Sequence, residues 1–190
     1  MKIIFAVIAL AVLAIIGSLY FPRVVNITQS QVPTPTGMNQ NFLDQVNECF
    51  LPITAAYGYD LYITSGFRSM ADQAKLYSEG RTASGTVVTE APPGHSLHNY
   101  GYAVDVADRQ NGYTINWDRL IKIASYCHLE SGGPGDLPHF EYRGGLSTND
   151  FAAGKRPPPL LLPCPVMIER YQKHQPLTLA DLRGCNAPKF

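Results

Sequence analysis

The sequence predicts a single α+β domain behind an apolar N-terminal segment. Apolar side chains recur at helical spacing in residues 41–57 and 117–127. Short runs with the composition or the alternation of β-strands lie at residues 61–64, 102–107 and 139–142. The chain has 190 residues, of which roughly 130 to 150 remain for a folded domain once a leader and tails are set aside. We therefore expect one hydrophobic core.

The first half of the domain is predicted as helix, strand and helix. The apolar stripe of the first helix is followed by residues 61–64, which are β-branched and aromatic and resemble a buried strand. Ser69 and Asp72 have the spacing of a capping box, which predicts that a second helix begins there. Arg68 therefore lies at a strand-to-helix corner.

The second half is predicted as loop, strand, helix and strand. Residues 81–97 contain Gly, Thr, Ser and Pro without periodicity, which indicates a loop. Residues 102–107 alternate in the manner of a strand. Asn116 can cap a helix over residues 117–127, and residues 139–142 alternate again.

The charge balance bears on possible partners. Lys and Arg total 15, as do Asp and Glu, so the formal net charge is zero. A chain without net charge has no long-range field that would attract a polyanion. Nucleic acid is therefore not an expected partner.

The N-terminal segment has the length of a membrane span. Residues 3–21 carry no charge, and as a helix they would extend about 28 Å, close to the thickness of a bilayer's hydrocarbon core. An uncleaved signal-anchor fits better than a cleaved signal peptide, because the apolar run is long and no small-x-small cleavage pattern follows it. The predicted organisation is a signal-anchor or signal peptide in residues 1–23, a linker in 24–38, a folded domain in 39–150 and a Pro-rich extension in 151–190.

The four cysteines suggest an oxidising compartment, since the chain also carries an export segment. Three pairings are possible. Pairing Cys164 with Cys185 in the tail is the most economical, and Cys49 would then join Cys127, linking two predicted helices. Free, buried thiols remain the alternative.

Three residues form a candidate metal site. His98 and Asp105 are seven positions apart, and His139 follows beside a turn. Two nitrogens and one oxygen leave a fourth tetrahedral position open, which is typical of catalytic zinc. Structural zinc sites usually contain cysteines, and no CxxC pair is present.

Four motifs, in order, resemble a known family. They are Ser65-Gly66-Phe67-Arg68-Ser69, then Gln73 with Leu76-Tyr77 and Gly80-Arg81-Thr82, then SxHxxGxAxD from Ser96 to Asp105, then DxPHFE from Asp136 to Glu141. Together they resemble the zinc D-alanyl-D-alanine carboxypeptidases and L-alanyl-D-glutamate endopeptidases of cell-wall metabolism, which include VanY-like and endolysin-type enzymes. The similarity covers roughly residues 40 to 145. It implies a Hedgehog/DD-peptidase-like fold, with a small, mainly antiparallel sheet, flanking helices and a zinc cleft.

The resemblance also implies roles for individual residues. His98, Asp105 and His139 would bind one zinc ion. Asp136 would be the general base, and Arg68 would stabilise the transition state. These roles suit zinc hydrolysis, in which a carboxylate carries a proton to the leaving amine and a guanidinium holds the developing oxyanion.

Three further residues are candidates for binding the substrate or for orienting the residues named above. Glu141 shares a strand face with His139 and could rival Asp136 as base, although orienting the histidine is favoured. Ser96 could bind substrate or orient the His98 loop. Gln73 is expected to support Arg68 from the helix behind it.

One segment departs from the family pattern. Between Ile123 and Asp136, relatives commonly carry Gly-Leu-x-Trp-Gly-Gly-x-Trp, whereas residues 127–135 contain no Trp. This segment flanks the cleft, so the metal motif alone does not decide the substrate preference.

The predicted function is hydrolysis of a peptide bond in peptidoglycan stem peptides, with the L-alanyl-D-glutamate bond favoured. D-alanyl-D-alanine carboxypeptidase activity is the first alternative, and a non-catalytic, zinc-containing wall-binding module is the second. A disulfide-stapled structural protein without metal is a third. We expect a monomer held at the membrane by its N-terminal helix, with its domain in the periplasm or outside the cell, and secreted if the leader is cleaved.

Overall fold

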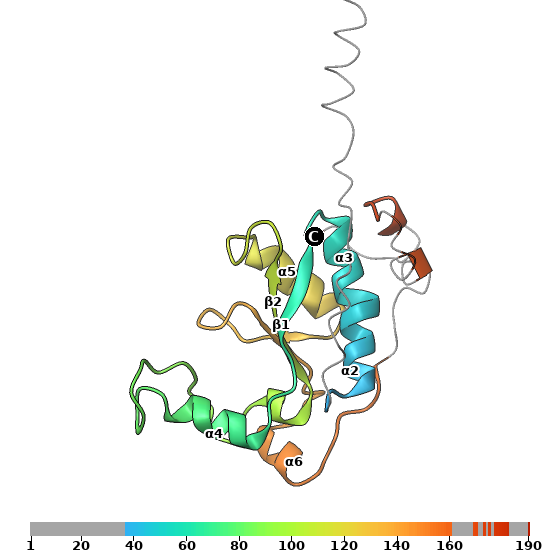
Figure 1. Cartoon of the computed structure of the whole chain (residues 1–190). Coiled ribbons are helices and arrows are strands. Elements are labelled where there is room, and N and C mark those ends of the chain that lie inside the picture. Colours follow the sequence, from blue (N-terminus) through green and yellow to red (C-terminus); the bar gives the residue numbers. More distant parts are fainter. Residues whose placement is uncertain (1–36, 161–168, 171–172, 174, 176, 183–189) are drawn as a thin grey trace, which may run out of the picture.

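A computed structural model of the chain is shown in Figure 1. The part described comprises residues 37–160, 169–170, 173, 175, 177–182 and 190. The predicted membrane segment, most of the linker, Cys164 and Cys185 lie outside these residues. Among the described helices, none is long and apolar enough to cross a membrane.

The first helical run is continuous from residue 40 to residue 56, as the apolar spacing predicts. It consists of α2 (Gln40–Gln45), a π-helical turn η1 (Val46–Phe50) and α3 (Leu51–Ala56). The Asn39 side chain caps its start by accepting a hydrogen bond from the backbone of the third residue along. Pro52 has no N–H and its ring would collide with the carbonyl four residues back. The wider turn just before Pro52 accommodates this proline.

The sheet has four strands in the order β1-β2-β4-β3, and every pairing is antiparallel. The strands are β1 (Leu61–Ser65), β2 (Ala103–Asp108), β3 (Glu130–Ser131) and β4 (His139–Glu141). The prediction of an α+β domain with a small antiparallel sheet is confirmed. Strand β3 was not predicted, because two residues are too few to show an alternating pattern.

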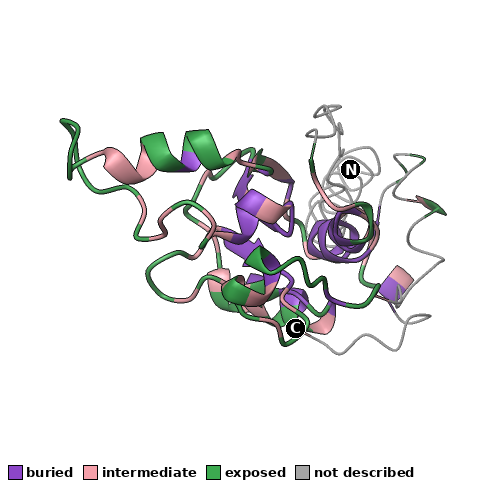
Figure 2. Ribbon diagram, turned by 90° about the horizontal axis from the view of Figure 1, so that it is seen from below, coloured by how far each residue is buried: buried purple, intermediate pink, exposed green. Residues whose placement is uncertain are grey.

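The core lies between the sheet and the helices on one of its faces. Helix α5 (Trp117–Tyr126) and the α2–α3 run cover this face. Phe140 of β4 packs on Phe50 with ring centroids 4.7 Å apart, and Val104 and Val106 of β2 are fully buried. Figure 2 shows the buried segments gathered in these helices and the sheet. Residues that alternate with the core residues point to the opposite face, which is free to hold a site.

An exposed arm projects from this core. It consists of α4 (Met70–Ser78) and the loop after it, and Figure 2 shows it extending away from the buried elements. Ser69 caps α4 as predicted. Arg81 ties the loop back to the helix, since it donates hydrogen bonds to the carbonyls of Tyr77 and Thr89. The predicted loop of residues 81–97 is therefore ordered by its own side chains.

The packed unit continues past the domain boundary expected at residue 150. Helix α6 (Thr148–Ala152) begins with a capping box at Ser147, a signal that the sequence analysis missed. Phe151 is 1% exposed and lies against the rings of Tyr100 and Tyr102. This aromatic contact holds α6 on the domain.

A disulfide joins Cys49 to Cys127, with Cα atoms 5.8 Å apart. This is the pairing expected for these two residues if the tail cysteines pair with each other. It links η1 to the residue that follows α5, and Gln45 donates a buried hydrogen bond to the Cys127 carbonyl. The two helical segments that cover the sheet are therefore cross-linked.

Removing this cross-link should destabilise the domain. The two cysteines are 78 residues apart, and opening a loop of that size costs about 2 to 4 kcal/mol. We expect the double variant Cys49→Ala/Cys127→Ala to unfold at a correspondingly lower urea concentration. Reduction should lower the stability of the wild-type chain by more than that of the variant, because only the wild type can lose the Cys49–Cys127 bond. Equal stability of the oxidised wild type and the variant would contradict this.

Candidate metal centre and active site

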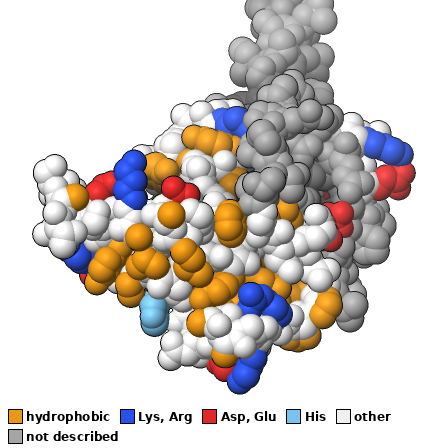
Figure 3. All heavy atoms as spheres, turned by 60° about the horizontal axis from the view of Figure 1, so that its bottom comes forward, with side chains coloured by type: hydrophobic (Ala, Val, Ile, Leu, Met, Phe, Trp, Pro, Cys, Tyr) orange, Lys and Arg blue, Asp and Glu red, His pale blue; other side chains and the backbone are white. Residues whose placement is uncertain are grey.

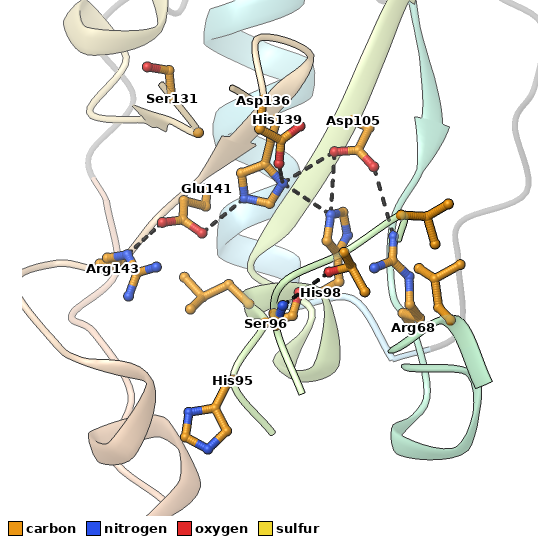
Figure 4. Close-up of a pocket in the computed structure, with 16 residues that line it drawn as sticks. Arg68, His95, Ser96, His98, Asp105, Ser131, Asp136, His139, Glu141 and Arg143 are labelled. Atoms are coloured by element: carbon orange, nitrogen blue, oxygen red, sulfur yellow. Dashed lines mark hydrogen bonds and ion pairs between the residues drawn. The ribbon is translucent and has the colours of Figure 1, made fainter. Parts of the chain in front are cut away.

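The three predicted metal ligands lie together on the open face of the sheet. Asp105 is on β2 and His139 is on β4, and the strand register places these two residues directly opposite each other. His98 comes from a 3-10 turn, η2 (Leu97–Tyr100), just before β2. Figure 4 shows the three side chains pointing toward one another.

The distances between the ligand atoms suit a tetrahedral ion. His98 Nε2 lies 3.2 Å from His139 Nδ1 and 3.4 Å from Asp105 Oδ1, and the His139-to-Asp105 distance is 3.2 Å. Ligand atoms bound to tetrahedral zinc at about 2.0 to 2.1 Å are about 3.3 Å from one another. In the part of the chain that the structure describes, this is the one cluster of His, Cys, Asp or Glu that could hold a metal.

The second nitrogen of each histidine has its own partner. His98 Nδ1 donates a hydrogen bond to the Gly66 carbonyl at 2.6 Å, and His139 Nε2 donates to Glu141 at 2.9 Å. These bonds leave the lone pairs of the two facing nitrogens directed at each other and at Asp105. Outer partners of this kind are typical of metal-binding histidines.

Without metal, protons must hold this cluster together. Burial lowers the pKa of His139, but hydrogen bonds to Asp105 and Glu141 outweigh it and raise the pKa to about 9. Burial raises the pKa of Asp105, but hydrogen bonds from His139 and His98 bring it well below its usual range. Three converging electron-rich atoms thus require a cation between them. Two imidazoles and a carboxylate fit zinc.

Gly101 lets the His98 turn approach the start of the domain. Its φ is 74°, which ends η2 in the left-handed conformation. A Cβ atom there would lie 2.2 Å from the Gly37 carbonyl oxygen. The Gly101 carbonyl accepts a hydrogen bond from the backbone N–H of Asn39, the residue that caps α2. The turn that carries His98 is therefore fixed to the start of α2.

Arg68 is held beside the metal ligands by a network. Its guanidinium donates to the Ser65 hydroxyl and to Gln73, at 3.2 and 3.0 Å, and lies 3.9 Å from Asp105. Gln73 is fully buried and donates in turn to the Ala91 carbonyl. Gln73 therefore fixes both Arg68 and the loop that leads to His98.

Asp136 stands at the open side of the cluster. Its carboxylate lies 4.0 Å from His139 Nδ1, and its side chain is 61% exposed. The turn that carries Asp136 packs closely on Gly132, where an added Cβ would lie 2.6 Å from the Asp136 carbonyl oxygen. Asp136 can thus reach both the ligand cluster and solvent.

Glu141 has a different environment from Asp136. One of its oxygens accepts from His139 and the other from Arg143. Burial raises the pKa of Glu141, but these two partners outweigh it and lower the pKa overall. Both oxygens are engaged, so Glu141 orients His139 and is a poor candidate for a base.

A cleft of about 350 Å³ opens over these residues. Ser96 lines it without capping η2. Three further residues that had no predicted role line the cleft, namely His95, Ser131 and Arg143. None belongs to a ligand motif, although Arg143 lies only four residues after His139.

Comparison with known proteins identifies the family. The chain is 34% identical over 128 residues to the peptidoglycan L-alanyl-D-glutamate endopeptidase CwlK of Bacillus subtilis, and the match covers 58% of this chain and 76% of CwlK. The chain belongs to this peptidase family. The family model VanY, described as D-alanyl-D-alanine carboxypeptidase, matches residues 36–127 of this chain. The resemblance carried by the motifs is thereby confirmed.

Solved structures similar to this chain include those of DacB and ChiX. DacB from Streptococcus pneumoniae D39 is 18% identical, with a TM-score of 0.44, over 75% of this chain and 80% of DacB. The L-Ala D-Glu endopeptidase ChiX from Serratia marcescens is 23% identical, with a TM-score of 0.39, over 60% of this chain and 84% of ChiX.

Zinc binding to the metal-free protein should release about one proton at pH 7. His139 has a pKa of about 9 without metal, so it is protonated at pH 7 and must lose that proton to become a ligand. Apparent zinc affinity should rise about tenfold per pH unit below pH 9. Calorimetric titration in buffers of different ionisation enthalpy measures the proton count. Zinc binding at pH 7 without proton release would contradict the ligand role of His139.

Proposed function

We propose that the chain is a zinc metallopeptidase that hydrolyses a peptide bond in the stem peptides of peptidoglycan. The observation that carries the proposal is the cluster of His98, Asp105 and His139, which lies in a cleft between Arg68 and Asp136. The relationship to CwlK supports the substrate class. We propose one zinc ion, because a single such cluster occurs among the described residues.

The positions of the metal ligands and of Asp136 suggest a role for each in the reaction. Zinc held by the three ligands would act as a Lewis acid and activate water for attack. Asp136 would accept the water's proton on its carboxylate and pass it to the leaving amine nitrogen. Its exposure and its position 4.0 Å from His139 Nδ1 support this role.

Arg68 would stabilise the oxygen that gains charge when the carbonyl is attacked. Two neutral side chains, Ser65 and Gln73, hold the guanidinium, so its positive charge is not cancelled at short range. The nearest carboxylate, that of Asp105, would be committed to the metal. A pre-oriented cation in a cleft is a typical oxyanion donor.

The bond between L-alanine and D-glutamate is the first candidate for cleavage, because CwlK is an L-alanyl-D-glutamate endopeptidase. The terminal D-alanyl-D-alanine bond is the second, since the matching family model carries that description. A non-catalytic wall-binding module is less well supported, because binding alone requires neither Asp136 nor Arg68 beside a metal.

The location of the enzyme is a separate proposal that depends on the sequence alone. The uncharged run of residues 3–21 would hold the chain at a membrane, with the peptidase domain in the periplasm or outside the cell. Detection of only a shortened, freely soluble form in cells would contradict a permanent anchor.

Cleavage of purified peptidoglycan fragments should be metal-dependent. We expect mass spectrometry to detect new fragments that begin with D-glutamate, and we expect a chelator to abolish them and added zinc to restore them. Loss of only the terminal D-alanine would identify the second candidate bond. Intact fragments in the presence of the zinc-loaded chain would refute the proposed activity.

Two substitutions separate metal binding from proton transfer. Asp136→Asn should keep zinc but lower kcat about 10²- to 10⁴-fold, because the amide cannot take a proton. His98→Ala should lose both zinc and activity. Metal analysis and turnover of the same preparations provide the test. Loss of zinc in Asp136→Asn would show that Asp136 is a ligand and not a base.

A further inference from the structure

Arg143 occupies the side of the cleft opposite to Arg68. Figure 4 shows the two arginines on either side of the ligand cluster, with Asp136 beside His139 between them. Arg143 lies just beyond β4, and its side chain is 33% exposed at the cleft wall. None of the family motifs in this chain includes it.

Glu141 holds Arg143 by one nitrogen only. The Nε of Arg143 donates to Glu141 Oε1 at 2.5 Å, while the other Glu141 oxygen accepts from His139. Among the described residues, no hydrogen bond or ion pair uses the two terminal nitrogens of Arg143. A guanidinium has five N–H groups, so four remain to meet a ligand. Because the bond to Glu141 limits its rotation, this donor pair is pre-oriented.

The charge of the cleft favours an anionic group. The cleft is lined by two arginines, Arg68 and Arg143, and by three carboxylates, those of Asp105, Asp136 and Glu141. A bound divalent ion would leave a positive excess. Arg68 uses one N–H of each terminal nitrogen on Gln73 and Ser65, which leaves one N–H on each for the oxyanion, whereas both terminal nitrogens of Arg143 are without a partner among the described residues. Arg143 is therefore the better placed to bind a carboxylate through two parallel hydrogen bonds.

Figure 3 shows which types of side chain are exposed on one face of the molecule. Hydrophobic side chains gather on the face shown, and charged side chains are scattered around them. Exposed apolar residues of the α4 side include Phe67, Met70, Val87 and Val88, and Val88 also lines the cleft. The apolar lining residues from α4 and the loop after it are Leu76, Val88 and Ala91.

We propose that Arg143 binds the free carboxylate of the substrate residue that supplies the leaving amine. This inference rests on the proposed function. Both candidate bonds share that carboxylate: D-glutamate in a stem peptide is extended through its side-chain carboxyl, which leaves its α-carboxylate free, and a terminal D-alanine carries its own. The carboxylate is two bonds from the scissile nitrogen. Asp136, the proposed proton donor to that nitrogen, lies beside His139 and lines the same cleft as Arg143.

The test compares two substrates that differ in one group. One peptide carries the free carboxylate on the leaving residue, and the other carries a carboxamide there. We expect the wild-type chain to prefer the carboxylate peptide about 100-fold in kcat/KM, since a charge-assisted, bidentate contact is lost with the amide. Arg143→Gln should remove most of this preference by raising KM for the carboxylate peptide, with little effect on the amide peptide. Arg143→Lys should retain part of the preference for the carboxylate peptide. Lysine keeps the positive charge but cannot form two parallel hydrogen bonds to a carboxylate.

A matched control removes the same charge elsewhere. Lys122 is exposed on α5, on the opposite side of the sheet, so Lys122→Gln should leave the preference unchanged. Zinc content of each variant should stay at the wild-type value. Equal losses on both peptides in Arg143→Gln, or loss of its zinc, would show that Arg143 acts only through Glu141 and would overturn the proposal.

Binding measurements separate this inference from the proposed function. The leaving fragment alone, as carboxylate or carboxamide, is titrated into the zinc-loaded wild type and Arg143→Gln. Carboxylate-selective binding that depends on Arg143, without cleavage of either peptide, would support the subsite and refute the peptidase activity. Cleavage by the wild type combined with binding that ignores both the carboxylate and Arg143 would refute the subsite and leave the activity standing.

Discussion

The site depends on keeping three electron-rich atoms, from His98, Asp105 and His139, within 3.4 Å of one another. Such a cluster is unfavourable unless a cation lies inside it, and both histidines are held by a hydrogen bond on their outer nitrogen. The Gly66 carbonyl fixes His98, and Glu141 fixes His139. These outer contacts set which nitrogen faces the metal position, and losing one of them typically lowers metal affinity about 10- to 100-fold.

The fold supplies this cluster by separating the two faces of one small sheet. Val104 and Phe140 point into the core beneath α2–α3 and α5, and their neighbours Asp105 and His139 consequently point the other way. A shift of one residue in the β2–β4 register would exchange the two faces. The buried Phe50–Phe140 contact opposes such a shift, and the Cys49–Cys127 disulfide holds the covering helices in place.

Signals that act over a few residues could be predicted from the sequence. The caps at Ser69 and Asn116 and the alternation of β2 and β4 are local, and the helices and strands follow them. Strand β3 exists only because it pairs with β4, and a two-residue segment has no pattern of its own. Arg143 was missed for a related reason. Its orientation comes from Glu141, which is already committed to His139, and that contact arises only in the folded site.

The proposed metal chemistry and the proposed substrate contact therefore depend on different residues. The ligands, Arg68 and Asp136 suit hydrolysis of either candidate bond, because attack on an amide carbonyl needs the same groups in each. Residues that meet the rest of the substrate must then decide between the bonds. Residues 127–135 contain no Trp, and Ser131 and Gly132 of this segment line the cleft together with Arg143. A carboxylate contact there would hold the leaving residue in either case. The choice between the two bonds would then depend on the substrate beyond the leaving residue. The stem peptide continues beyond D-glutamate, whereas it ends at the terminal D-alanine.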